Sequence, residues 1–292
     1  MNAHLTSTAR TVDRVVDKVH NGPTAQSDDN SILIAPGRPE LTDPFLVMGE
    51  ERFSMPGFDW HPHRGMETVT IVLDGVLEHG DSLGHAGVLE PGDVQWMTAG
   101  RGVIHRELAF RDERAHVLQL WINLPAARKL VETRYQDLRA GVQATVVEPG
   151  VTVRVISGSV GAVTGPALNH RPILGLDLTL DPRTTYRQAL PATFRAFAHV
   201  VSGRATIGGH RVRAGQTAWS DPATSASTLD FATPDGDERT RIVLYAGQPL
   251  GEPVVAGGPF VMTTRAEIEQ AFRDYHAGAF GPVPRLARIR DR

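Results

Sequence analysis

Residues 60–75 read WHPHRGMETVTIVLDG, and residues 103–107 read VIHRE. Each stretch holds two potential metal ligands two positions apart, and side chains at i and i+2 of a β-strand point to the same face. Two such pairs on separate strands can close around one metal ion. The four side chains are His61, His63, His105 and Glu107. The two stretches therefore predict a β-domain with a metal site on the inner face of its strands.

The first stretch also alternates in polarity, which is typical of a half-buried strand. Its even positions include the polar side chains of Arg64, Thr68 and Thr70. We therefore expect the odd positions to face the interior of a barrel. On this interpretation Glu67 shares the interior face with His63.

Two glutamates compete for the fourth ligand position of such a site. Glu67 follows His63 by four residues and Glu107 follows His105 by two, so each shares the parity of a histidine. Periodicity does not choose between them, and either carboxylate could instead accept a hydrogen bond from a ligand imidazole. Three imidazoles and one carboxylate suit divalent first-row metals and leave positions open for water, dioxygen or an organic ligand.

Glycine and proline clusters divide the chain into short segments, as tight turns do in an all-β domain. The clearest is the run between residues 75 and 93, and a similar glycine spacing returns between residues 203 and 215. This weak repeat predicts a duplicated barrel. In the second half His170, His199 and His210 are isolated from one another, so we expect no second metal site there.

The composition restricts the class of function. The chain has 292 residues, 41% of them hydrophobic and 22% charged, which is enough for two medium domains. A net charge of -3 with no long basic run argues against direct binding of nucleic acid or an anionic membrane. Without cysteine, any redox chemistry must belong to the metal. Since we find neither a signal peptide nor a long apolar run, we expect a cytoplasmic protein.

A short helix is predicted near the end of the chain. Thr264 and Glu267 have the spacing of a capping box, and apolar residues follow at helical intervals up to Tyr275. Gly278 is the expected stop signal. We expect the apolar stripe of this helix to pack on the barrel.

The run from residue 60 to residue 107 resembles the signature of the pirins, a branch of the cupin superfamily. The resemblance continues through VLQLWINLP at 117–125, VTVRVI at 151–156 and GPFVM at 258–262. It implies an all-β bicupin of two tandem jelly-roll barrels with a short C-terminal helix. Residues 1–140 would form the N-terminal cupin domain with the metal site. Residues 141–292 would form a C-terminal cupin domain whose own site is absent or degenerate.

Carried over to this chain, the metal ligands of the family fall on His61, His63, His105 and Glu107. The resemblance therefore favours Glu107 over Glu67, which becomes a neighbour of the site or a substrate-facing carboxylate. The cofactor implied is one divalent transition metal. We expect iron(II), although manganese, nickel, copper and zinc accept the same donors.

The resemblance implies two classes of function. Some pirins are similar in activity to quercetin 2,3-dioxygenase, which would make a flavonol-type aromatic compound and dioxygen the substrates. Glu107 would then be the catalytic proton acceptor, with Glu67 as the alternative. Eukaryotic pirins are instead implicated as redox-responsive regulators, which would make a transcription factor or a metabolic enzyme the partner. A different cupin-type enzyme, such as an isomerase, is a third hypothesis.

Overall fold

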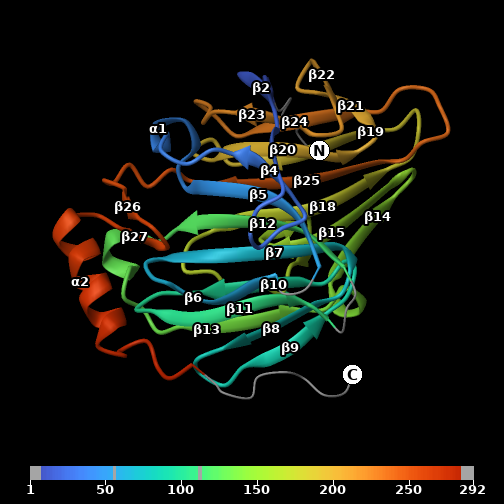
Figure 1. Cartoon of the computed structure of the whole chain (residues 1–292). Helices are drawn as coiled ribbons and strands as arrows, with labels where there is room; N and C mark the ends of the chain where they lie inside the picture. The colour runs from blue at the N-terminus through green and yellow to red at the C-terminus, as the bar shows by residue number, and fades with distance from the viewer. Residues whose placement is uncertain (1–7, 55–56, 111–113, 284–292) are drawn as a thin grey trace. The chain divides into compact units, whose positions relative to one another are not determined.

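The computed structural model describes residues 8–54, 57–110 and 114–283. These residues form mostly β-strands, with α-helices only at α1 (Pro39–Thr42) and α2 (Arg265–His276), so the all-β expectation is confirmed (Figure 1). The chain divides into two compact units. We call Val19–Val142 together with the described residues from Leu250 onward the histidine unit, and the described residues up to Lys18 together with Gln143–Pro249 the companion unit.

The histidine unit has a seven-stranded and a four-stranded sheet. In spatial order the larger sheet contains β13 (Arg134–Leu138), β10 (Val94–Thr98), β7 (Met66–Gly75), β12 (Ala115–Asn123), β5 (Phe45–Phe53), β4 (Asp29–Ile34) and β3 (Val19–Gly22). The smaller sheet contains β6 (Phe58–His63), β11 (Val103–Ala109), β8 (Leu77–Asp81) and β9 (Ala86–Leu89). The histidine unit also contains a two-stranded β-ribbon and two 3-10 turns. The ribbon pairs β26 (Val255–Gly257) with β27 (Phe260–Met262), and the turns are η2 (Ala126–Arg128) and η3 (Ala140–Val142).

The companion unit also has two main sheets. Its seven-stranded sheet contains β14 (Ala144–Glu148), β15 (Val151–Ser157), β18 (Ile173–Leu180), β25 (Thr240–Gly247), β20 (Arg195–Ser202), β23 (Gln216–Ser220) and β2 (Arg14–Asp17). Its five-stranded sheet contains β1 (Thr8–Ala9), β24 (Ser227–Ala232), β21 (Arg204–Ile207), β22 (His210–Arg213) and β19 (Thr185–Leu190), and β16 (Ser159–Val160) pairs with β17 (Val163–Thr164). Its core is aliphatic: Leu176, Leu178 and Leu244 are fully buried.

The observed units differ from the expected division into 1–140 and 141–292 at both ends of the chain. Near the middle the units change at residue 142, close to the expected boundary. However, β1 and β2 pair with β24 and β23 of the companion unit, and β27 bridges to Arg64 of the histidine unit. These pairings join segments far apart in the sequence, so local periodicity could not indicate them.

The expectation that odd positions face the interior from His61 to Leu73 is wrong beyond His63. The strand is interrupted after His63, and Gly65 adopts a φ of +81°, which favours glycine. The chain then leaves β6 in the smaller sheet and enters β7 in the larger one. Because the two strands belong to different sheets, the parity of one does not carry into the other.

The predicted C-terminal helix is confirmed. Thr264 caps α2, and the side chain of Glu267 completes the capping box. Ile268 and Ala271 are buried in a cluster with Phe260 of the neighbouring β27, and Figure 1 shows α2 beside this ribbon. Gly278 follows the helix with a φ of +79°. The apolar stripe therefore packs within the histidine unit.

Within the part of the chain that the structure describes, neither helix has the length or the apolar character needed to cross a membrane.

Candidate metal centre

Three histidines converge inside the histidine unit. His61 and His105 lie directly opposite each other on the antiparallel strands β6 and β11. The ring centroids are 4.3 Å apart for His61 and His105, and 5.0 Å apart for both His61–His63 and His63–His105. One ring nitrogen from each histidine lies within 4.8 Å of the other two. The two predicted stretches are therefore brought together as three potential ligands.

Backbone carbonyls orient two of these imidazoles. Nδ1 of His61 lies 2.7 Å from the carbonyl oxygen of Asp59, and Nδ1 of His63 lies 3.2 Å from that of Pro259. Because a carbonyl oxygen only accepts, Nδ1 of each ring must donate, which assigns the proton to Nδ1 and a lone pair to Nε2. Metal-binding histidines commonly have this arrangement.

Three of the remaining ring nitrogens have no hydrogen-bond partner among the described residues. Nε2 of His63 and both nitrogens of His105 are buried and lack a hydrogen bond to any described residue. Burial, with a smaller contribution from His61, lowers the pKa of His63 to about 3, and burial also lowers the pKa of His105. Neutral imidazoles with unpaired lone pairs are costly in a protein interior unless a ligand binds them. This donor set fits a divalent transition metal.

Glu107 lies beside this group but is held by other partners. A shift in register between β11 and β6 separates it from His105, so that Glu107 is opposite Phe58. Its Oε1 accepts a hydrogen bond from the hydroxyl of Thr70 at 3.0 Å, and its Oε2 accepts one from the amide of Gln119 at 2.6 Å. Burial raises the pKa of Glu107. The group of mutually close ligand atoms contains the three histidines and not this carboxylate.

Glu67 does not face the site. On β7 it is Thr70, an even position, that contacts Glu107 and lies opposite Gln119 of β12. Successive side chains of a strand point to opposite faces, so the odd position Glu67 belongs to the other face of the sheet. There its Oε1 accepts a hydrogen bond from Thr98 at 2.6 Å. The expectation that Glu67 adjoins the metal or the substrate is therefore wrong.

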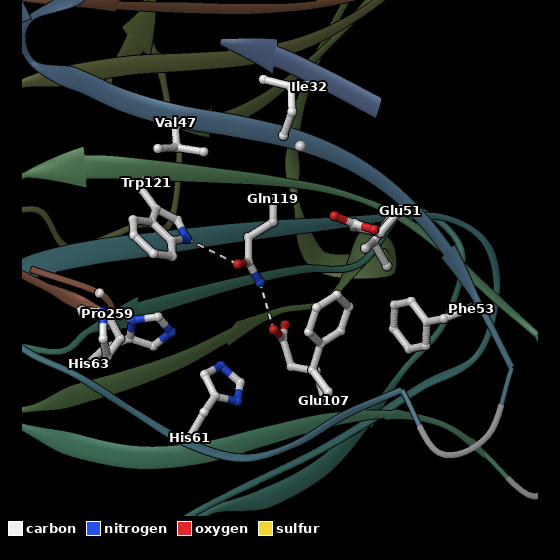
Figure 2. Close-up of a pocket in the computed structure, with 14 residues that line it drawn as sticks. Ile32, Val47, Glu51, Phe53, His61, His63, Glu107, Gln119, Trp121 and Pro259 are labelled. Atoms are coloured by element: carbon white, nitrogen blue, oxygen red, sulfur yellow. Dashed lines mark hydrogen bonds between the residues drawn. The ribbon is translucent and has the colours of Figure 1, made fainter. Parts of the chain in front are cut away.

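A pocket opens next to the histidines (Figure 2). Its volume is about 300 Å³, which is at the lower end of the usual range for small-molecule sites. Most of its wall is apolar or aromatic, while the polar side chains include two histidines and two glutamates. The residues that line it include His61, His63, Glu107, Gln119, Trp121, Phe53 and Phe58.

Comparison with known proteins supports the resemblance seen in the sequence. The family model described as Pirin matches residues 32–122, and the model described as Pirin C-terminal cupin domain matches residues 175–281. Pirin from Homo sapiens is 41% identical over 247 residues, covering 82% of this chain and 84% of the human protein.

The chain belongs to the pirin family.

Solved structures of similar proteins share its fold. A quercetin 2,3-dioxygenase from Acinetobacter baumannii superposes with a TM-score of 0.84 at 29% identity, covering 95% of this chain and 100% of that chain. A protein from Geobacillus kaustophilus gives a TM-score of 0.81 at 38% identity, covering 85% and 100%. The expected bicupin fold is therefore confirmed for this pirin.

Four contributors to the site were not predicted from the sequence. Thr70, Gln119 and Trp121 surround Glu107 and His63, and Pro259 contributes only a backbone carbonyl. Gln119 and Trp121 were detectable in principle, because they stand two apart in the run VLQLWI, whose other residues are aliphatic. The carbonyl of Pro259 had no detectable signal, since any residue carries one.

The isolated histidines of the companion unit make different contacts. Nδ1 of the buried His199 lies 2.9 Å from the hydroxyl of Thr217, and Nδ1 of the exposed His210 lies 3.4 Å from the carbonyl of Gly208. His170 lines a separate pocket of this unit.

Proposed function

We propose that this pirin is a metal-dependent dioxygenase that acts on flavonol-type aromatic compounds, with iron(II) as the metal. The observation that carries the proposal is the convergence of three imidazoles, two of which line a largely apolar pocket. The 29% identical quercetin 2,3-dioxygenase supports it, because that protein shares the fold over nearly the whole chain.

In this proposal His61, His63 and His105 hold the metal, and Glu107 is both the fourth ligand and the catalytic proton acceptor. When bound, the metal would supply Lewis acidity that lowers the pKa of a coordinated hydroxyl and, if redox-active, a path for electrons to dioxygen. Zinc would supply only the first of these properties.

The side chains of the pocket determine which compound binds and where its proton goes. Phe53, Phe58 and Trp121 offer aromatic surface to a planar ligand beside the histidines. Each oxygen of Glu107 already accepts one hydrogen bond and keeps further lone pairs for a substrate hydroxyl. Because burial raises the pKa of Glu107, its carboxylate is a stronger base than an exposed one.

The test is aerobic turnover of quercetin by iron-loaded protein prepared without oxygen. We expect consumption of dioxygen and release of carbon monoxide, and we expect His105→Ala to abolish both. His210→Ala is the matched control, because this exposed histidine lies in the companion unit, and it should leave both signals unchanged.

Failure of turnover with iron, manganese, nickel and copper would overturn the dioxygenase proposal and favour the regulatory alternative. In that alternative the oxidation state of the metal changes the charge at the site and thereby its affinity for a protein partner. Conversion of a substrate without any need for oxygen would instead indicate a different cupin-type enzyme. Elemental analysis of the anaerobically purified protein identifies the metal.

A further inference from the structure

A chain of hydrogen bonds runs from Trp121 to Glu107 (Figure 2). Nε1 of Trp121 donates to Oε1 of Gln119 at 3.1 Å, and Nε2 of Gln119 donates to Oε2 of Glu107 at 2.6 Å. Nε2 of Gln119 also donates to the hydroxyl of Thr70 at 3.1 Å, and that hydroxyl donates to Oε1 of Glu107 at 3.0 Å. Both oxygens of the carboxylate are therefore held by donors from the neighbouring sheet.

The donor and acceptor roles in this series of hydrogen bonds follow from the indole of Trp121. The indole N–H of Trp121 can only donate, so the atom of Gln119 that faces it must be the amide oxygen. The amide nitrogen of Gln119 then has to face Glu107. Trp121 thus decides that Glu107 meets a donor at this position, which favours its ionised form.

Strand register explains why these side chains meet. Gln119 and Trp121 stand two residues apart on β12, so their side chains point to the same face of the sheet. They lie directly opposite Thr70 and Thr68 of β7, which share that face. The ring of Trp121 also contacts the ring of His63 edge to face, with centroids 5.1 Å apart. One network therefore touches both a histidine of the site and its carboxylate.

We propose that Gln119 is a positioning residue for Glu107 and that Trp121 acts through Gln119, so that together they hold the carboxylate ready to join the three histidines around the metal. The proposal rests on the metal centre proposed above but not on dioxygenase activity. Hydrogen bonds that orient a ligating group typically change metal affinity about 10-fold to 100-fold when they are removed.

The test measures the affinity for Ni²⁺ by competition with a coloured chelator, after circular dichroism has shown that each variant is folded. We expect Gln119→Leu to weaken binding about 10-fold to 100-fold. In a Glu107→Gln background the same change should cost less than about threefold, because the carboxylate it positions is gone. The ligand-field spectrum of the Co²⁺-loaded Gln119→Leu protein should shift toward that of Glu107→Gln.

Two further variants separate positioning from general packing. Trp121→Phe keeps the ring but removes the N–H, and we expect its effect to be non-additive with Gln119→Leu. Gln95→Leu is the matched control: this buried glutamine lies opposite Thr70 on β10, and its amide donates to the hydroxyl of Tyr135 instead. We expect its Ni²⁺ affinity to equal that of the unmodified protein.

Three results would overturn the proposal. They are an unchanged or tighter affinity in Gln119→Leu, an equal loss with and without Glu107, and an equal loss in Gln95→Leu. Turnover is read independently of these results. If Gln119→Leu weakens Ni²⁺ binding only when Glu107 is present, and quercetin releases no carbon monoxide, the dioxygenase function is wrong and the positioning role is supported.

Discussion

Glu67 is a buried carboxyl group on the face of β7 opposite the site, with Thr98 as a hydrogen-bond donor. Burial raises the pKa of Glu67 to about 7, from an ordinary value of 4.5. The folded protein therefore retains this proton at pH values where the unfolded chain has released it. In such a window the folded state binds more protons, so the stability that this group contributes falls as the pH rises from 4.5 to 7.

Replacement of Glu67 by glutamine should remove this penalty. An amide keeps an acceptor for the hydroxyl of Thr98 and never ionises. We expect Glu67→Gln to raise the free energy of unfolding by up to about 3 kcal/mol at pH 8, and to change it little at pH 4. Urea denaturation at both pH values measures the difference. Equal effects at the two pH values would show that titration of Glu67 is not the cause.

At the scale of secondary-structure elements, Lys129 ties three segments of the histidine unit together. Its Nζ donates to the carbonyl oxygens of Gly65 and Val261, at 2.8 and 2.9 Å, and to the side chain of Asn123 at 2.5 Å. Burial lowers the pKa of Lys129 to about 8. Val261 lies two residues after Pro259, whose carbonyl orients His63. The lysine thus supports the position of β27 and, through it, an imidazole of the site.

Loss of this ammonium group should affect both stability and metal binding. Lys129→Met keeps most of the buried side chain but leaves three acceptors without their donor. Unsatisfied buried groups cost about 1–3 kcal/mol each, so we expect at least about 3 kcal/mol of destabilisation. We also expect weaker binding of Ni²⁺, measured by chelator competition.

The neighbouring Arg128 provides the control for that measurement. Its side chain is exposed. Arg128→Met should therefore leave the free energy of unfolding and the free energy of Ni²⁺ binding within about 0.5 kcal/mol of those of the unmodified protein. A Lys129→Met protein with unchanged metal affinity would show that β27 keeps its place without the lysine.

At the scale of the whole molecule, the first and the last described segments of the chain each belong to a unit that is formed mainly by residues far away in the sequence. The N-terminal strands β1 and β2 extend sheets of the companion unit, whereas β26, β27 and α2 belong to the histidine unit. Phe260, Met262 and Ile268 share a buried cluster with Ile104, which immediately precedes His105. The strand that carries His105 is therefore packed against residues from the last described part of the chain.

Metal should stabilise the protein by mass action at this centre. A ligand at about 100 times its dissociation constant stabilises the state that binds it by about 2.7 kcal/mol. We therefore expect Ni²⁺ to raise the melting temperature of the unmodified protein and to leave that of His105→Ala unchanged in differential scanning calorimetry. An equal rise in both proteins would place the binding elsewhere.

Local sequence was sufficient for several features of this pirin. The spacing of two residues within HPH and HRE is a local property of a strand, and it predicted that three histidines and Glu107 gather at one point. The structure brings the three histidines together, whereas ligation by Glu107 stays a prediction. The capping box at Thr264 is likewise local, and it correctly placed the start of α2. Glycine spacing predicted the duplicated all-β architecture. Each of these signals is read from short stretches of the chain, two of which are compared where a pair or a repeat is inferred.

Tertiary structure alone decided the surroundings of the metal centre. The turn at Gly65 moves the chain from one sheet to the other, which turns Glu67 away and brings Thr70 to Glu107. Gln119 of β12 donates to Glu107, and the carbonyl of Pro259 accepts from His63. The placement of the first strands in the companion unit and of the last segments in the histidine unit depends on similar long-range pairing. These contacts depend on the register between distant strands, which no local periodicity encodes.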